Sequence, residues 1–112
     1  MNFLAKLEKL EILSAGFNSN IKDASISELY KCKNLERLFI GNTDVSIDST
    51  TNLASCKNLH DLSLCGCINV TDKKILTLLN SEKLQFINLR NSGVSQTYIN
   101  LLKNGKNIKI IW

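Results

Sequence analysis

The chain has 112 residues and a formal net charge of +4, with 44% hydrophobic and 21% charged residues. This size and composition predict one small globular domain and exclude a disordered or low-complexity chain. Its 14 lysines and arginines are scattered and nowhere form a run of five, so a dedicated nucleic-acid or acidic-lipid surface is not expected.

The first residues, MNFLAKLEKLEIL, carry Lys6 and Glu8 inside their apolar pattern and hold no apolar run of signal-peptide length. A secretory or membrane address is therefore not expected. Four cysteines in such a chain indicate free thiols in a reducing compartment, which predicts a cytoplasmic location. No proline forces a break, so residues 1–112 are expected to form a single domain.

One apolar pattern recurs along the whole chain. The segments LEILSAGFNSNI, LERLFIGNTDV, LHDLSLCGCINV and LQFINLRNSGV share it, and IKIIW is a partial fifth copy. The copies start 25, 24, 25 and 24 residues apart, at Leu10, Leu35, Leu59, Leu84 and Ile108. Alternation inside each copy predicts a short strand whose side chains face opposite sides, with Leu62 and Leu64 in the core.

A small polar residue follows each predicted strand, where it can bond backbone groups that no sheet partner satisfies. These residues are Asn18, Thr43, Cys67 and Ser92. Apolar residues at three-to-four spacing then predict one-sided helices. The spaced residues are Ile26 and Leu29, Ile75 with Leu78 or Leu79, and Ile99 with Leu102.

Serine or threonine precedes the predicted helices at the N-cap position, as Ser46, Thr71 and Ser95. The chain is expected to turn back to the next strand through Leu7, Cys32, Cys56, Ser81 and Gly105.

The order L-x-x-L-x-L-x-x-(Asn, Thr, Cys or Ser)-x-(x)-(Val or Ile) resembles the leucine-rich repeat, in four in-phase copies and a fragment that cover essentially the whole chain. The resemblance implies an α/β fold: a right-handed leucine-rich-repeat solenoid, a short horseshoe with a parallel sheet on its concave side and helices on its convex side. It also implies four repeats and a partial fifth.

The third copy is similar to the cysteine-containing subtype of this repeat, through Cys56, Cys67 and the following Val70-Thr71-Asp72. That subtype is common in the substrate-binding halves of F-box proteins, and related repeats occur in ribonuclease-inhibitor-like scaffolds. The second copy keeps Cys32 but has Thr43 in place of the later cysteine, and the fourth copy has serine at both places.

Residues 56–72, CKNLHDLSLCGCINVTD, hold three of the four cysteines and the only histidine. Zinc needs two close cysteine pairs or a matching histidine cluster. Cys67 is expected to point inward and Cys65 outward, so we expect no metal and no cofactor. His60 has no acid or nucleophile at a motif spacing, which predicts a surface residue at a strand edge, not a catalytic base. We expect no catalytic residue and no enzyme.

The cysteines differ in their expected surroundings. Cys56 and Cys67 are expected to be small buried residues of the repeat. Cys32 and Cys56 should stack in neighbouring coils within disulfide reach, although a reducing compartment favours free thiols. Cys65 is expected to be the exposed thiol, the one most open to oxidation or alkylation.

Side chains that face away from the core are expected to form columns across the sheet. The columns read Ile12, Arg37, Asp61, Phe86, Ile110; then Ser14, Phe39, Ser63, Asn88, Trp112; then Gly16, Gly41, Cys65, Arg90. Aromatic residues beside arginines are typical of protein-binding hot spots. The residues expected to bind a partner are Arg37, Phe39, Asp61, Phe86, Asn88, Arg90 and Trp112.

These patterns predict a non-catalytic module that binds a protein partner through the concave sheet, with no nucleic acid and no membrane. The family resemblance implies, as an alternative, the substrate-recognition part of an F-box-type ubiquitin ligase adaptor, although the chain contains no F-box segment. Another alternative is a structural subunit of a larger assembly, docked or self-associated end to end through uncapped solenoid ends, or a piece of a longer array whose missing repeats cover the aromatic residues.

Overall fold

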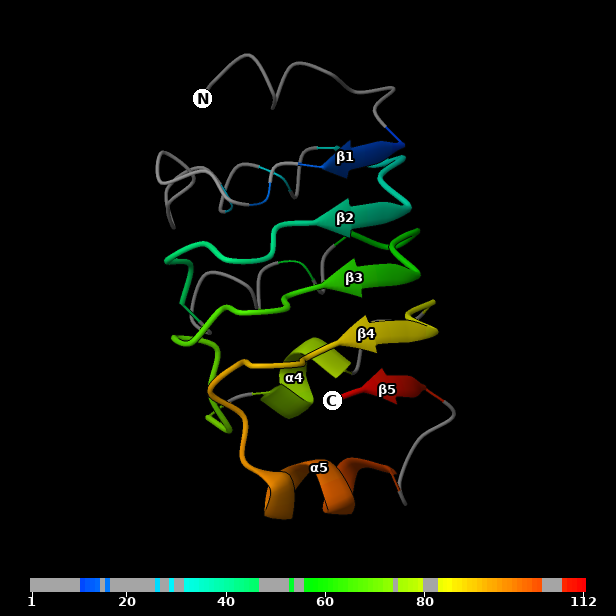
Figure 1. The fold of residues 1–112 in the computed structure, drawn as a ribbon. Helices are drawn as coiled ribbons and strands as arrows, with labels where there is room; N and C mark the ends of the chain where they lie inside the picture. Colours follow the sequence, from blue (N-terminus) through cyan, green and yellow to red (C-terminus); the bar gives the residue numbers. More distant parts are fainter. Residues whose placement is uncertain are drawn as a thin grey trace.

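A computed structural model describes residues 11–14, 16, 26, 29, 32–46, 53, 56–73, 75–79, 83–103 and 108–112. Among these, three-residue strands form one parallel sheet in the order β1-β2-β3-β4-β5, which confirms the predicted α/β class and parallel sheet. The strands are β1 (Ile12–Ser14), β2 (Arg37–Phe39), β3 (Asp61–Ser63), β4 (Phe86–Asn88) and β5 (Lys109–Ile111). The helices are α4 (Ile75–Leu79) and α5 (Gln96–Lys103). Figure 1 shows the strands stacked in chain order.

Some residues of the predicted turns and of the first predicted helix lie outside the described ranges. Asn18, Leu7, Ser81 and Gly105 lie outside them. Ile26 and Leu29 are described singly, and both are buried as expected. Across the described ranges, no helix has the length and the apolar content that crossing a membrane would require.

Strands β1 to β4 pair at equal positions of the repeat, and β5 is offset by one residue. Ile12 pairs with Arg37, Arg37 with Asp61, Asp61 with Phe86, and Phe86 with Lys109, so the separations are 25, 24, 25 and 23 residues. The first three separations match the predicted period. We call each strand with the chain that leads to the next strand a coil; parallel pairing places every coil beside its neighbour in sequence.

The register of β5 differs from the prediction by one residue. Ile110 pairs with Ile87 and is buried, while Lys109 and Ile111 flank it on the outward side. The predicted places of Ile110 and Trp112 in the outward columns are therefore wrong, and Trp112 follows the strand. A slip of one residue exchanges the two faces of a strand. The observed register buries Ile110 and leaves the Lys109 ammonium in water, where it costs no desolvation.

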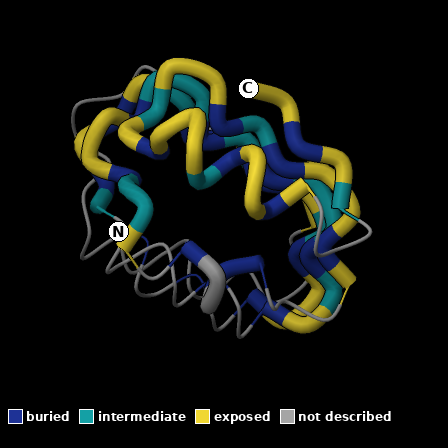
Figure 2. The backbone as a smooth tube through the Cα atoms, turned by 90° about the horizontal axis from the view of Figure 1, so that it is seen from below, coloured by how far each residue is buried: buried dark blue, intermediate teal, exposed yellow. Residues whose placement is uncertain are grey.

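The core lies on the inward side of the strands. The middle residue of each strand from β2 to β5 is buried, and so is the residue two places after the middle of β2, β3 and β4. These residues are Leu38, Leu62, Ile87 and Ile110, followed by Ile40, Leu64 and Leu89. The helices add Ile75, Leu78, Leu79, Ile99 and Leu102 to the same core. Figure 2 shows buried and exposed residues alternating along the chain.

A left-handed residue ends each of the three middle strand segments. Asn42, Gly66 and Asn91 have φ angles of 57°, 77° and 58°, and each lies three residues after its strand. Glycine and asparagine enter this region at low cost. The amide of Asn42 donates to the Cys65 carbonyl at 2.8 Å, and that of Gly66 donates to the Arg90 carbonyl at 2.8 Å. The turns thus extend the hydrogen bonding between coils beyond the strands.

The small polar residue that follows β2, β3 and β4 bonds backbone, as predicted. Thr43 Oγ1 donates to the Ile40 carbonyl at 2.9 Å, and Cys67 Sγ donates across to the same carbonyl at 3.3 Å. Ser92 Oγ accepts the Val94 amide at 3.3 Å. Thr43 and Cys67 are buried, so these bonds remove the cost of burying a polar side chain.

Residues from two coils, Ser95 and Asp72, order the amino end of α5. Ser95 Oγ accepts the Tyr98 amide at 3.2 Å, which confirms the predicted N-cap. The Asp72 carboxylate in the previous coil accepts the Ser95 amide and the Ser95 hydroxyl, both at 2.7 Å. It therefore holds the cap itself in place.

The N-cap predicted at Thr71 is wrong. Thr71 lies four residues before α4 and forms a parallel bridge with Gly93. The Ile75 amide donates to the Asp72 carbonyl at 3.3 Å, so the chain turns into the helix only after Asp72. The segment that Ser46 was predicted to cap lies outside the described residues.

Replacing Ser95 by alanine should lower the free energy of unfolding by about 1–2 kcal/mol, because the cap and the bond from the Ser95 hydroxyl to Asp72 are lost together, while the bond from the Ser95 backbone amide to Asp72 remains. Urea denaturation measures the change. Thr97→Ala, at an exposed position of the same helix, should change stability by less than about 0.5 kcal/mol. Asp72→Ala should cost less in the Ser95→Ala background than in the wild type, because both substitutions remove the bond between the Ser95 hydroxyl and Asp72; fully additive effects would contradict the link.

Candidate functional site

Ten side chains leave the sheet on the side away from the core, and we call this surface the open sheet face. It consists of Ile12, Ser14, Arg37, Phe39, Asp61, Ser63, Phe86, Asn88, Lys109 and Ile111. The arrangement follows from strand geometry, since in each strand the first and last residues point to the face opposite the middle one. It confirms the first two predicted columns for β1 to β4.

The open sheet face exposes three large apolar side chains to solvent. Ile12, Phe86 and Ile111 are 54%, 42% and 43% exposed, and Phe39 is partly buried among its neighbours. Arg37 is exposed beside Phe39 on the same strand. Exposed aromatic and aliphatic groups beside arginine are the composition of binding surfaces between proteins.

Six of the seven residues predicted to bind a partner lie together on or beside this face. Arg37, Phe39, Asp61, Phe86 and Asn88 are on its strands, and Arg90 follows β4 at its carboxyl end. Trp112 is not on the face, because of the register of β5. Lys109 and Ile111 take the places predicted for Ile110 and Trp112. The single polar residue of KIIW was the available signal, since it favours the phase that exposes Lys109.

A shallow hollow of about 310 Å³ lies at the carboxyl ends of β1, β2 and β3. It is lined by Ser14, Gly16, Phe39, Gly41, Asn42, Ser63 and Cys65. A Cβ atom on Gly41 would lie 2.7 Å from the Cys65 carbonyl oxygen, so only glycine lets the two coils approach this closely. The hollow exists because glycine leaves no side chain there and because Phe39 forms one wall.

Cys65 and Cys67 differ in exposure, as predicted. Cys67 is buried, whereas Cys65 is partly exposed in the hollow. All four thiols are free. Burial, and secondarily the neighbouring Cys32, raises the pKa of Cys56 to about 11, and Cys56 Sγ donates to the Leu29 carbonyl at 3.6 Å. Burial also raises the pKa of Cys32. Within the described ranges, no three His, Cys, Asp or Glu side chains are grouped to hold a metal ion.

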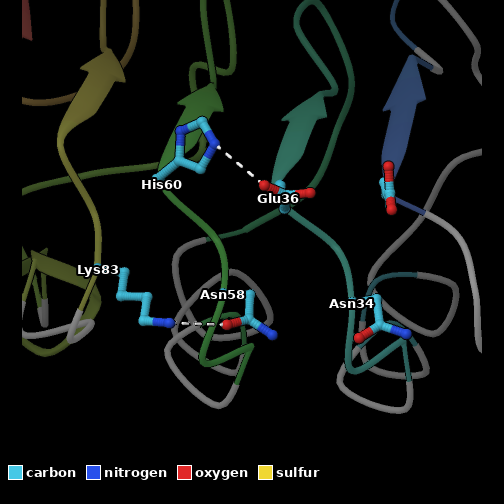
Figure 3. A pocket seen from close by; sticks show the side chains of 6 residues that line it. Asn34, Glu36, Asn58, His60 and Lys83 are labelled. Atoms are coloured by element: carbon cyan, nitrogen blue, oxygen red, sulfur yellow. Dashed lines mark hydrogen bonds and ion pairs between the residues drawn. The ribbon is translucent and has the colours of Figure 1, made fainter.

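A polar groove of about 240 Å³ crosses the amino ends of the strands (Figure 3). Its lining residues are Glu11, Asn34, Glu36, Asn58, His60 and Lys83. His60 Nε2 lies 3.6 Å from Glu36 Oε1, and Lys83 Nζ donates to Asn58 Oδ1 at 3.0 Å. Each contact joins one coil to the next. His60 lies just before β3 at the predicted strand edge, and its recorded partner is a carboxylate, not a nucleophile.

A third hollow, of about 350 Å³, lies beyond the carboxyl end of β4. Arg90, Asn91, Ser92, Val94 and Trp112 line it. The Trp112 indole is 45% exposed, and its Nε1 donates to the Val94 carbonyl at 3.4 Å. The register of β5 thus places Trp112 beside the coil of β4, next to Arg90.

No protein-family model matches the chain, and a search of curated protein sequences finds no significant match.

One thiol should react with Ellman's reagent in the native protein at pH 8, and four after denaturation. Cys65 is the partly exposed thiol; Cys56 is buried, and its raised pKa of about 11 keeps it a neutral thiol at pH 8. Because that pKa is raised in the folded state, the stabilisation that Cys56 provides is present below its ordinary pKa and is lost as the pH rises toward about 11. The variant Cys65→Ser should show no rapid reaction. Two or more rapid thiols in the wild type would contradict this assignment.

Proposed function

We propose that this protein is a non-catalytic interaction module of the leucine-rich-repeat type that binds a protein partner through the open sheet face. The observation that supports it is the exposure of Ile12, Phe86 and Ile111 on a sheet whose opposite face already buries the core. Apolar side chains that stability does not require to be exposed are typical of a surface that another protein covers. We include in the proposal that the chain acts in the cytoplasm, because its four thiols are free.

The finer architecture belongs to the same proposal. We infer a right-handed solenoid of four repeats and a partial fifth, with the open sheet face concave and the helices convex. Strand separations of 25, 24, 25 and 23 residues and left-handed turns at three equivalent places support it. Parallel strands joined by crossovers of this length are almost always right-handed. A concave sheet would let a partner contact several coils at once.

Capture of partners from cell extract by the full chain tests the proposal. Phe39→Ala with Phe86→Ala should lose at least one partner that the wild type enriches, because truncating a central aromatic anchor costs about 2 kcal/mol or more. The matched control is Ile68→Ala with Leu101→Ala, which removes two exposed apolar side chains away from the open sheet face. If both double variants capture the same proteins as the wild type, the proposal fails. Recovery of a cullin complex would favour the F-box alternative.

A structural subunit is the second candidate function, supported by the end of the sheet at β5. In the described part of the chain β5 pairs only with β4, and Ile111 and Trp112 are exposed beside it. An edge strand with unpaired backbone groups can pair with another chain.

Light scattering of the isolated protein separates the two candidate functions. End-to-end association predicts a mass that rises with concentration, and Ile110→Pro should abolish that rise because proline cannot donate a backbone hydrogen bond at the edge. The matched substitution Lys109→Ala, on the open sheet face, should leave the association intact. A stable monomer at all concentrations would contradict the assembly candidate and leave the interaction module.

A further inference from the structure

The hollow beside β4 presents a cation without a recorded partner. Arg90 is exposed, and in the described part of the chain no hydrogen bond or ion pair involves its guanidinium. None of the side chains that line the hollow with it is acidic. The nearby Asp72 carboxylate is engaged, since both of its oxygens accept hydrogen bonds from Ser95. The positive charge of Arg90 is therefore available to a ligand.

The walls of the hollow are fixed before any ligand arrives. The Arg90 amide donates to Asn88 Oδ1 at 3.0 Å, and the Arg90 carbonyl accepts the Gly66 amide at 2.8 Å. Trp112 also lines the hollow, and its indole Nε1 donates to the Val94 carbonyl at 3.4 Å. A site whose backbone and aromatic wall are already ordered spends less conformational entropy when it binds.

The exposed charges on β5 and α5 have the same sign as Arg90. Lys109 is exposed on β5, and Lys103 is exposed at the end of α5. Of the acidic residues that the structure describes on or beside the sheet, Glu11 and Glu36 precede β1 and β2, Asp61 lies on β3, and the Asp72 carboxylate is bound to the N-cap of α5. The end of the open sheet face near β4 and β5 therefore attracts negative charge.

We propose that the hollow binds a carboxylate side chain, aspartate or glutamate, of the protein partner. The Arg90 guanidinium is the donor, because its planar fork matches a carboxylate in a two-point contact. The Trp112 indole packs against the aliphatic stem of the same residue. The inference rests on the proposed function, and it adds the chemistry of the partner and the orientation in which its acidic segment approaches.

Fluorescence of the full chain tests the site directly, because Trp112 is the single tryptophan. The probes are acetyl-Gly-Glu-Gly-amide, its glutamine counterpart and inorganic phosphate. The glutamate peptide should change Trp112 emission with a Kd of about 1 mM, and the glutamine peptide should bind about tenfold more weakly. Arg90→Gln should remove the response. Arg37→Gln, an exposed arginine on β2, should leave it intact.

Three results would overturn the proposal: equal binding of the two peptides, an equal loss in Arg37→Gln and Arg90→Gln, or no emission change with the glutamate peptide up to about 10 mM. Tighter binding of phosphate than of the glutamate peptide would also overturn it in favour of a phosphoryl ligand. Matching urea midpoints for the wild type and both arginine variants verify that they are folded.

Partner capture distinguishes failure of this inference from failure of the proposed function. Suppose that Phe39→Ala with Phe86→Ala loses partners, while Arg90→Gln keeps them and the wild type binds the glutamate and glutamine peptides equally. The open sheet face then binds protein, and the carboxylate site is wrong. If neither variant loses a partner, the proposed function itself fails.

Discussion

Hydrogen bonding between successive coils is the constraint on which the rest of this structure depends. A strand of three residues has too few backbone groups and too little apolar surface to be stable alone. Pairing in register aligns the middle residues of β2 to β5, Leu38, Leu62, Ile87 and Ile110, so that one continuous core forms. The turns continue the same bonding through Asn42 and Gly66. Each coil is therefore stabilised by its neighbours.

The same register creates the surface that we propose to be functional. With one side of every strand packed on the core, the other side has no structural task, and its residues are free to serve recognition. Phe39 and Phe86 are on that side. At the carboxyl ends of β1 to β3, the close approach of two coils at Gly41 leaves a shallow hollow beside Phe39. The polar contacts at the amino edge, such as His60 with Glu36, join neighbouring coils.

The register of β5 and the contact between Asp72 and Ser95 shape the region around Arg90. The spacing to β5 is shorter than the earlier ones, and this moves Trp112 off the open sheet face and beside Arg90. Asp72 reaches from one coil to the N-cap of the next, where both of its oxygens accept hydrogen bonds from Ser95. The hollow that holds Arg90 and Trp112 results from the shorter spacing to β5.

The sequence by itself determined the period, the strand positions of β1 to β4, the inward and outward faces and the N-cap at Ser95. Each of these follows from local alternation or from a side chain bonding its own backbone. Only the tertiary structure decided the register of β5, because one lysine among the apolar residues of KIIW favours a phase without fixing it, and the pairing depends on β4. It also decided the start of α4 after Asp72 and the meeting of Arg90 with Trp112, since contacts between coils, which no local pattern encodes, set them.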